Sequence, residues 1–220
     1  MTKLSLCGMQ ITVYGKGRRA VWLNTFADEG TAAFAQITAE DCALIALAVP
    51  DWDRMLSPWP APALMPQEAD FAGGAAEYLH MLTGEIMPQV CEQCGIAAEK
   101  HILAGYSLAG LFALWALCQT DAFCAAGSMS GSLWYPGFPE YTQTHAMKRR
   151  PEMIYLSVGD RECRTSHPLL SQVQANTEAY ADMCRAQGIE TVFELNKGGH
   201  TKNAAGRTAR GIGALLAHCV

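Results

Sequence analysis

Long hydrophobic runs and clusters of basic residues are both missing from this sequence. Its longest continuous apolar run, residues 108–118, is shorter than the roughly 18 residues that a membrane-spanning helix needs, so no membrane span is expected. Only 17% of the residues are charged and the net charge is -5, without any stripe of lysine and arginine. Because nucleic-acid binding requires clustered positive charge, nucleic acid is not an expected partner either.

The sequence also lacks a secretion signal and a cysteine spacing typical of a disulfide framework. The first ten residues contain no apolar segment of signal-peptide length followed by a small-residue cleavage site. The nine cysteines are odd in number and scattered, and several lie in apolar segments, where cysteine behaves as a small hydrophobic residue. These features predict a cytoplasmic location with reduced thiols.

One C-x-x-C spacing occurs, between Cys91 and Cys94. Such a pair can bind a metal or act in redox chemistry, but here it ends a helical pattern and no second C-x-x-C follows. Two cysteines on one helix face explain it better. We therefore expect no metal site and no cofactor.

Half of the 220 residues are hydrophobic, enough for one α/β domain spanning residues 1–220. Residues 11–14 and 20–24 read as two strands joined by a turn, which predicts an antiparallel hairpin at the sheet edge. From residue 43 onward apolar strands alternate with helical patterns, which predicts a mostly parallel sheet with helices on both faces. The stretch between residues 132 and 153 is too short for a large lid domain.

The segment 105–110, Gly-Tyr-Ser-Leu-Ala-Gly, lies between an apolar strand pattern and an apolar helix pattern. A serine at such a sharp turn suits a nucleophile elbow, where the residues two positions away must be small. Gly105 and Ala109 meet that requirement, although Ala109 replaces the last glycine of the usual G-x-S-x-G pattern. Because a short pattern of this kind also arises by chance, its context decides whether Ser107 is a nucleophile.

Ser107, Asp160 and His200 each follow a predicted strand at its carboxyl end. The carboxyl ends of parallel strands share one edge of the sheet, so these side chains are expected to converge there. Their order along the chain, serine then acid then histidine, is that of the α/β-hydrolase fold. The sequence therefore predicts a catalytic triad on an α/β-hydrolase fold.

The chemistry of each side chain sets its expected role. Ser107 needs a base within hydrogen-bond reach, and His200 can take its proton and return it to a leaving alcohol. Asp160 would orient the imidazole and stabilise the imidazolium. Glu162, two residues farther from the strand, is the alternative acid. The oxyanion requires backbone donors, for which we expect the N–H of Leu108 and one N–H from the loop after Val49, that of Trp52 or alternatively Asp51.

A stiff loop at residues 50–66, with five prolines and two tryptophans, follows the apolar strand at 43–49. It lies at the carboxyl end of a strand, where open parallel sheets bind ligands. The residues that we expect to line a substrate pocket are Asp51, Trp59, Trp134 and Tyr135. Tryptophans that only fill the structure are the alternative interpretation.

Taken together, these motifs resemble the esterase branch of the α/β-hydrolase superfamily that includes esterase D-like and siderophore-esterase-like proteins. The resemblance extends from about residue 40 onward and depends on residues 51–60, 105–110, 130–135, 157–162 and 198–200. It implies hydrolysis of carboxylic esters without a metal or organic cofactor, so a small-molecule ester is the expected partner. The loop at 51–60 resembles the family's loop after the third core strand.

Two other functions remain compatible with the pattern. An acyltransferase or a thioesterase would use the same triad and differ in the acceptor or the ester cleaved. A non-catalytic binding protein could also share the fold, because a fold does not carry function by itself. The sequence makes no prediction of the oligomeric state.

Overall fold

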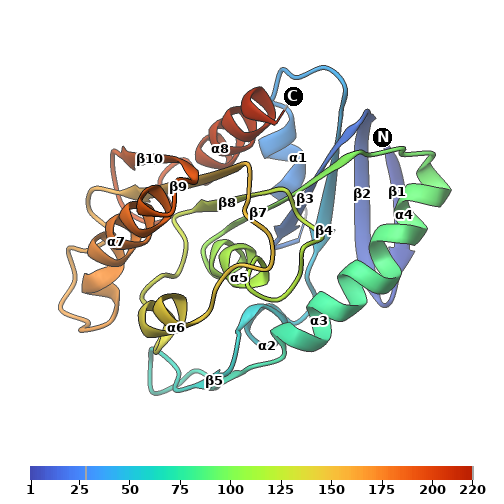
Figure 1. Cartoon of the computed structure of the whole chain (residues 1–220). Helices are drawn as coiled ribbons and strands as arrows, with labels where there is room; N and C mark the ends of the chain where they lie inside the picture. The colour runs from blue at the N-terminus through green and yellow to red at the C-terminus, as the bar shows by residue number, and fades with distance from the viewer. Residues whose placement is uncertain (28, 220) are drawn as a thin grey trace.

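A central eight-stranded sheet organises this computed structural model, which describes residues 1–27 and 29–219 (Figure 1). Its strands are β1 (Thr2–Leu6), β2 (Met9–Lys16), β3 (Arg19–Thr25), β4 (Cys42–Ala48), β7 (Lys100–Tyr106), β8 (Ala125–Met129), β9 (Met153–Gly159) and β10 (Glu190–Asn196). They lie in the order β1-β2-β4-β3-β7-β8-β9-β10. A separate antiparallel pair is formed by β5 (Pro60–Ala61) and β6 (Phe71–Ala72).

The helices connect these strands and cover both faces of the sheet. They are α1 (Glu29–Phe34), α2 (Trp52–Leu56), α3 (Ala75–Met81), the π-helical turn η1 (Leu82–Ile86), α4 (Met87–Cys94), α5 (Leu108–Ala116), α6 (Phe138–Thr144), the 3₁₀ turn η2 (Leu170–Gln172), α7 (Val173–Ala186) and α8 (Ala204–His218). Helices α1 and α8 lie on one face, whereas α3, α4, α5 and α7 lie on the other (Figure 1). The prediction of helices on both faces is confirmed.

Six neighbouring strands, from β4 to β10, run parallel, and β1 and β2 form an antiparallel edge. This confirms a mostly parallel sheet with an antiparallel N-terminal edge. Between β8 and β9 the described chain forms α6 and loops, and no large lid domain. No helix in residues 1–27 and 29–219 combines the length and the apolar character that crossing a membrane requires.

The predicted hairpin between β2 and β3 is wrong, because β4 lies between these two strands. Val13 of β2 lies opposite Ile45 of β4 in an antiparallel pair, and β3 runs parallel along the other side of β4. The short link must therefore cross the end of β4. It does so at Gly17, where a Cβ would lie 2.0 Å from the carbonyl carbon of Asp41. Only glycine permits that approach.

Helix α5 forms the centre of the larger hydrophobic core, and all nine of its residues are buried. It packs on β7 and β8 directly behind the strand that carries Ser107. The continuous apolar run in the sequence thus belongs to a helix surrounded by protein. The N-terminus of α5 is consequently held rigidly at the carboxyl edge of the sheet.

Two glycines of α8 allow a matched test of how this helix packs on the sheet. A Cβ on Gly211 would lie 2.7 Å from Sδ of Met129 and 2.8 Å from the ring of Tyr155, whereas a Cβ on Gly213 would contact nothing within 4 Å. Gly211→Ala should lower the free energy of unfolding by about 1–3 kcal/mol, because it overpacks the core. Gly213→Ala should raise it by about 0.5–1 kcal/mol through helix propensity alone.

Urea denaturation of both variants, followed by circular dichroism, gives the two values. If Gly211→Ala proved as stable as Gly213→Ala, α8 would not pack against Met129 and Tyr155 as described.

Candidate active site

Ser107 lies in the sharp turn between β7 and α5. Its backbone angles are φ 58° and ψ -124°, a conformation that a residue with a side chain rarely adopts. The turn is possible because its flanking residues are small: a Cβ on Gly105 would lie 2.3 Å from the carbonyl carbon of Ala109. Such strain persists where the surrounding structure enforces it, and it aims the serine hydroxyl away from the sheet.

His200 lies in the loop between β10 and α8, beside Ser107. Its Nε2 atom is 3.0 Å from Oγ of Ser107, and its Nδ1 atom is 2.7 Å from Oε2 of Glu162. The loop is held by a hydrogen bond from the hydroxyl of Tyr106 to the carbonyl oxygen of His200. Three side chains that are distant in the sequence thus form one continuous hydrogen-bonded line.

The carboxylate that contacts the imidazole is Glu162, the alternative acid, and the contacts of Asp160 lie elsewhere. One oxygen of Asp160 accepts the backbone N–H of Gly198 at 2.8 Å, and the other lies 3.1 Å from Nζ of Lys197. The Gly198 N–H and then the Lys197 ammonium lower the pKa of Asp160. Asp160 therefore holds the loop that precedes His200 and leaves the imidazole to another carboxylate.

A tight turn after β9 explains why Glu162 reaches His200. The N–H of Glu162 donates to the carbonyl oxygen of Gly159 at 3.0 Å, and the N–H of Gly159 donates to Oε1 of Glu162 at 2.6 Å. The chain therefore folds back, and the longer glutamate side chain returns over the strand end. Its two oxygens have separate tasks, since Oε1 is anchored to the protein and Oε2 faces His200.

Arg207, from the first turns of α8, is the residue of this site that the sequence analysis missed. Its Nη1 atom donates to Oε1 of Glu162 and to Oγ of Ser130, both at 2.9 Å. Its Nη2 atom donates to the carbonyl oxygens of Gly199, at 3.1 Å, and of Lys197, at 3.3 Å. The guanidinium thus connects the acid to the loop that carries the histidine.

The Arg207–Glu162 pair is almost completely buried, with side-chain exposures of 2% and 3%. Burial acts to raise the pKa of Glu162, but hydrogen bonds from His200, Ser130 and the Gly159 N–H outweigh it and lower the pKa overall. Glu162 is therefore charged at neutral pH. A charged carboxylate is what a neighbouring imidazole needs when it takes up a proton.

Residues 22–204 match the family model described as "Putative esterase". The chain belongs to this esterase family. The matched residues begin at β3, well before the resemblance at residue 40 that the motifs indicated.

A relative of known sequence covers most of this chain. Uncharacterized protein YbbA of Bacillus subtilis (strain 168) is 26% identical over 160 residues, which cover 71% of this chain and 64% of that protein. The match thus spans less than two thirds of that relative.

Two solved structures share the fold of this esterase family member. The siderophore hydrolase EstA from Aspergillus nidulans has a TM-score of 0.74 at 21% identity, over 95% of this chain and 90% of that one. An IroE-like serine hydrolase from Shewanella oneidensis has a TM-score of 0.81 at 16% identity, over 98% of this chain and 79% of that one. The chain has the α/β-hydrolase fold.

The strand order of the esterase fold bears on the predicted oxyanion donors. Leu108 is the first residue of α5, and an N–H at that position has no acceptor within its own helix. Trp52 follows β4, but β3 lies between β4 and the strand that carries Ser107. Asn24, near the end of β3, is in register with Gly105. The loop that leaves the sheet directly beside the nucleophile therefore begins at Phe26.

The residues expected to line a pocket mostly build the aromatic core beneath the proline-rich loop. Tyr135 is fully buried and its hydroxyl donates to the carbonyl oxygen of Trp59 at 2.6 Å. Trp59 Nε1 donates to the carbonyl oxygen of Pro136 at 2.8 Å, and Trp134 is 9% exposed. Asp51 accepts the N–H of Arg54 at 3.4 Å, at the start of α2. These contacts favour a structural role for all four residues.

Trp52 is half-buried and borders a cavity of about 130 Å³. Tyr106, the neighbour of the nucleophile, and Thr25 also line this cavity. The Trp52 ring lies edge-on to Phe26, with ring centroids 6.0 Å apart. The Trp52 side chain therefore lies at a cavity that Tyr106 also lines.

Replacing Glu162 and Asp160 by their amides, each in a separate variant, distinguishes the roles of the two carboxylates. Glu162→Gln should lower kcat for p-nitrophenyl acetate about 10⁴-fold, since a neutral amide no longer fixes the imidazole tautomer or stabilises the imidazolium. Asp160→Asn should keep activity within about tenfold, because it changes only loop contacts. Steady-state kinetics of the folded variants measure both. The opposite ranking would restore Asp160 as the acid.

Arg207 acts as a positioning residue, because it contacts Glu162 and the His200 loop and neither Ser107 nor the open side of the site. Arg207→Met should lower kcat by about 10- to 1,000-fold while KM stays within about twofold. Arg207→Lys should recover part of the loss, since one ammonium cannot reproduce the planar fork.

Arg210→Met is the matched control, one helical turn along α8, where the arginine is half exposed and pairs with Glu194 at 3.3 Å. It should leave kcat unchanged. If KM rose with unchanged kcat in Arg207→Met, Arg207 would act on substrate binding instead.

Proposed function

We propose that this protein hydrolyses small carboxylic esters through an acyl-enzyme formed on Ser107, with His200 as general base and acid and Glu162 as the orienting acid. The observation that carries the proposal is the hydrogen-bonded line Ser107 Oγ to His200 Nε2, at 3.0 Å, and His200 Nδ1 to Glu162 Oε2, at 2.7 Å. Both distances lie in the range for a poised base and its orienting carboxylate.

The charged Glu162 sets the direction of proton transfer. It accepts the Nδ1–H of neutral His200, which leaves Nε2 as the acceptor that faces Ser107. As Oγ attacks the ester carbonyl carbon, its proton passes to Nε2, and the resulting imidazolium is stabilised by the buried carboxylate. Nε2–H then protonates the departing alkoxide, and the C–O bond of the ester breaks.

A water molecule completes the cycle. His200 takes a proton from the water as its oxygen attacks the acyl carbon, and returns that proton to Oγ as the acyl–serine bond breaks. The products are a carboxylic acid and an alcohol, and Ser107 is regenerated. The His200 side chain is 43% exposed, so the imidazole is open to solvent. That access favours hydrolysis over acyl transfer.

The negative oxygen of each tetrahedral intermediate requires N–H donors. Leu108 N–H supplies one, at the start of α5, where the helix dipole also favours negative charge. The second comes from the backbone N–H of Phe26, because its loop follows the strand next to β7. This replaces the donor first expected from Trp52.

The open site suits a small or extended ester, and several structural neighbours point to one class. EstA is described as a siderophore hydrolase, and two other neighbours from Shigella flexneri are described as an enterochelin esterase and an enterobactin esterase. Esters of this kind are therefore the first natural compounds to assay, alongside short acyl and aryl esters.

The test combines active-site labelling with product analysis. A fluorophosphonate probe should label the wild-type protein within minutes and should not label Ser107→Ala, whose turnover should fall about 10⁴- to 10⁶-fold. Ser132→Ala is a matched control, since Ser132 is also buried near the elbow, and it should label normally. Absence of labelling in the folded wild type would indicate a binding protein without catalysis.

Adding an alcohol to the p-nitrophenyl ester assay separates hydrolysis from acyl transfer. Free acid should remain the main product. Partition of most acyl groups to the added alcohol would reassign the protein as an acyltransferase.

A further inference from the structure

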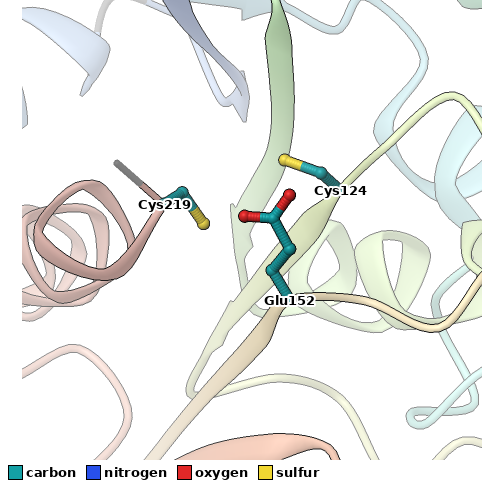
Figure 2. Close-up of side chains that lie close together, drawn as sticks. All are labelled: Cys124, Glu152 and Cys219. Atoms are coloured by element: carbon teal, nitrogen blue, oxygen red, sulfur yellow. The ribbon is translucent and has the colours of Figure 1, made fainter.

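A second group of reactive side chains lies at the opposite edge of the sheet from Ser107. Cys124 directly precedes β8, Glu152 directly precedes β9, and Cys219 directly follows α8. Both strands therefore begin here, whereas the triad lies where the strands end. Figure 2 shows the two sulfur atoms and the Glu152 carboxylate directed toward a common space.

The geometry of the three donor atoms suits one cation. One sulfur from each cysteine and one oxygen of Glu152 all lie within 4.8 Å of one another. A tetrahedral Zn²⁺, with Zn–S bonds of about 2.3 Å, holds two sulfur ligands roughly 3.8 Å apart. The donors therefore need to approach one another by at most about 1 Å to reach that arrangement.

The backbone already fixes two of these residues relative to each other. The N–H of Glu152 donates to the carbonyl oxygen of Cys124 at 2.7 Å. The N–H of Cys219 donates to the carbonyl oxygen of Leu215 at 2.9 Å, as a continuation of α8. Both cysteines are buried and Glu152 is half-buried, so the group has one side open to solvent. A cation and a water ligand can enter from that side.

The two thiols share their protons unequally. A hydrogen bond from the Cys219 thiol lowers the pKa of Cys124, and the same bond raises the pKa of Cys219. The positive charges of Arg149 and Lys100 also favour the Cys124 thiolate. A thiolate is the form that binds metals.

Two basic residues compete with a cation for Glu152. Nζ of Lys100 lies 2.9 Å from Oε2, and Nη2 of Arg149 lies 3.8 Å from Oε1. The side chains of Lys100 and Glu152 are 28% and 32% exposed. An ion pair with this much exposure contributes little, so displacing Lys100 from one oxygen weakens a cation site by no more than about fivefold.

We propose that Cys124, Glu152 and Cys219 form a binding site for one thiophilic divalent cation, with Zn²⁺ as the first choice and water as its fourth ligand. Two sulfur ligands select Zn²⁺ over Mg²⁺ or Ca²⁺, which prefer oxygen. The cation connects the end of α8 to the starts of β8 and β9. It lies away from the triad and is independent of the ester hydrolysis proposed above.

Metal binding is measured on the full chain, reduced and freed of metal by a chelator. Equilibrium dialysis against Zn²⁺ should give one ion per chain. Replacing Zn²⁺ by Co²⁺ should give the absorption of thiolate-to-cobalt charge transfer. At a free Zn²⁺ concentration about 100 times the Kd, the melting temperature should rise by about 5–10 °C.

Variants assign the ligands. Cys124→Ser and Cys219→Ser should each weaken Zn²⁺ binding at least about 100-fold, and Glu152→Gln about tenfold. Lys100→Gln should bind Zn²⁺ up to about fivefold more tightly, because it removes a competitor of the cation. Unchanged esterase activity in each variant shows that the protein is folded.

The double variant Cys91→Ser/Cys94→Ser is the matched control, since these two cysteines have the spacing of a common metal motif. It should bind Zn²⁺ like the wild type. The proposal is overturned if zinc is lost in this control, if zinc is retained in both Cys124→Ser and Cys219→Ser, or if the wild-type cobalt spectrum lacks sulfur bands.

Discussion

The buried ion pair between Arg207 and Glu162 is the interaction on which the active site depends. It holds the acid, and through two carbonyl oxygens it holds the loop of His200. Loss of one partner of such a pair costs about 3–5 kcal/mol, because the other charge stays buried and unpaired. Replacing both partners with apolar groups could restore stability but not the carboxylate that faces the imidazole. The pair therefore serves to hold the charged Glu162 carboxylate beside the imidazole, more than to stabilise the fold.

Ser107 and His200 could be recognised in the sequence because each follows a strand whose end is fixed by the sheet. Glu162 could not be chosen over Asp160, since both follow the same strand. The decision depends on a turn closed by hydrogen bonds between Gly159 and Glu162, and residue spacing does not reveal such bonds. Arg207 could not be predicted for a related reason. A basic residue is expected on the buried side of a helix only when its acidic partner is known, and the sequence does not reveal that partner.

The fold was predictable where local pattern determines it. Alternating strands and helices after residue 43 specify parallel crossovers, and the structure agrees. The N-terminal edge was not predictable in the same way, because two short strands close in sequence normally pair with each other. β4, of which all residues but Ala48 are buried, has a strand on each side, and the glycine at position 17 lets the chain cross its end. Tertiary burial thus overrides the local preference for a hairpin. It also places β3, and not β4, next to β7, so the loop after β3 is the one that lies beside Ser107.

That crossing has a consequence for how the chain acquires its structure. During synthesis β1 and β2 can pair as soon as they emerge from the ribosome, but β3 has neither of its neighbours until β4, at residues 42–48, and later β7 are made. The β1–β2 pair can therefore form locally, whereas β3 must wait for a more distant segment, β4, to insert between it and β2. Such non-local closure is slow, and until it happens one edge of β2 and both edges of β3 are unpaired and exposed to other molecules.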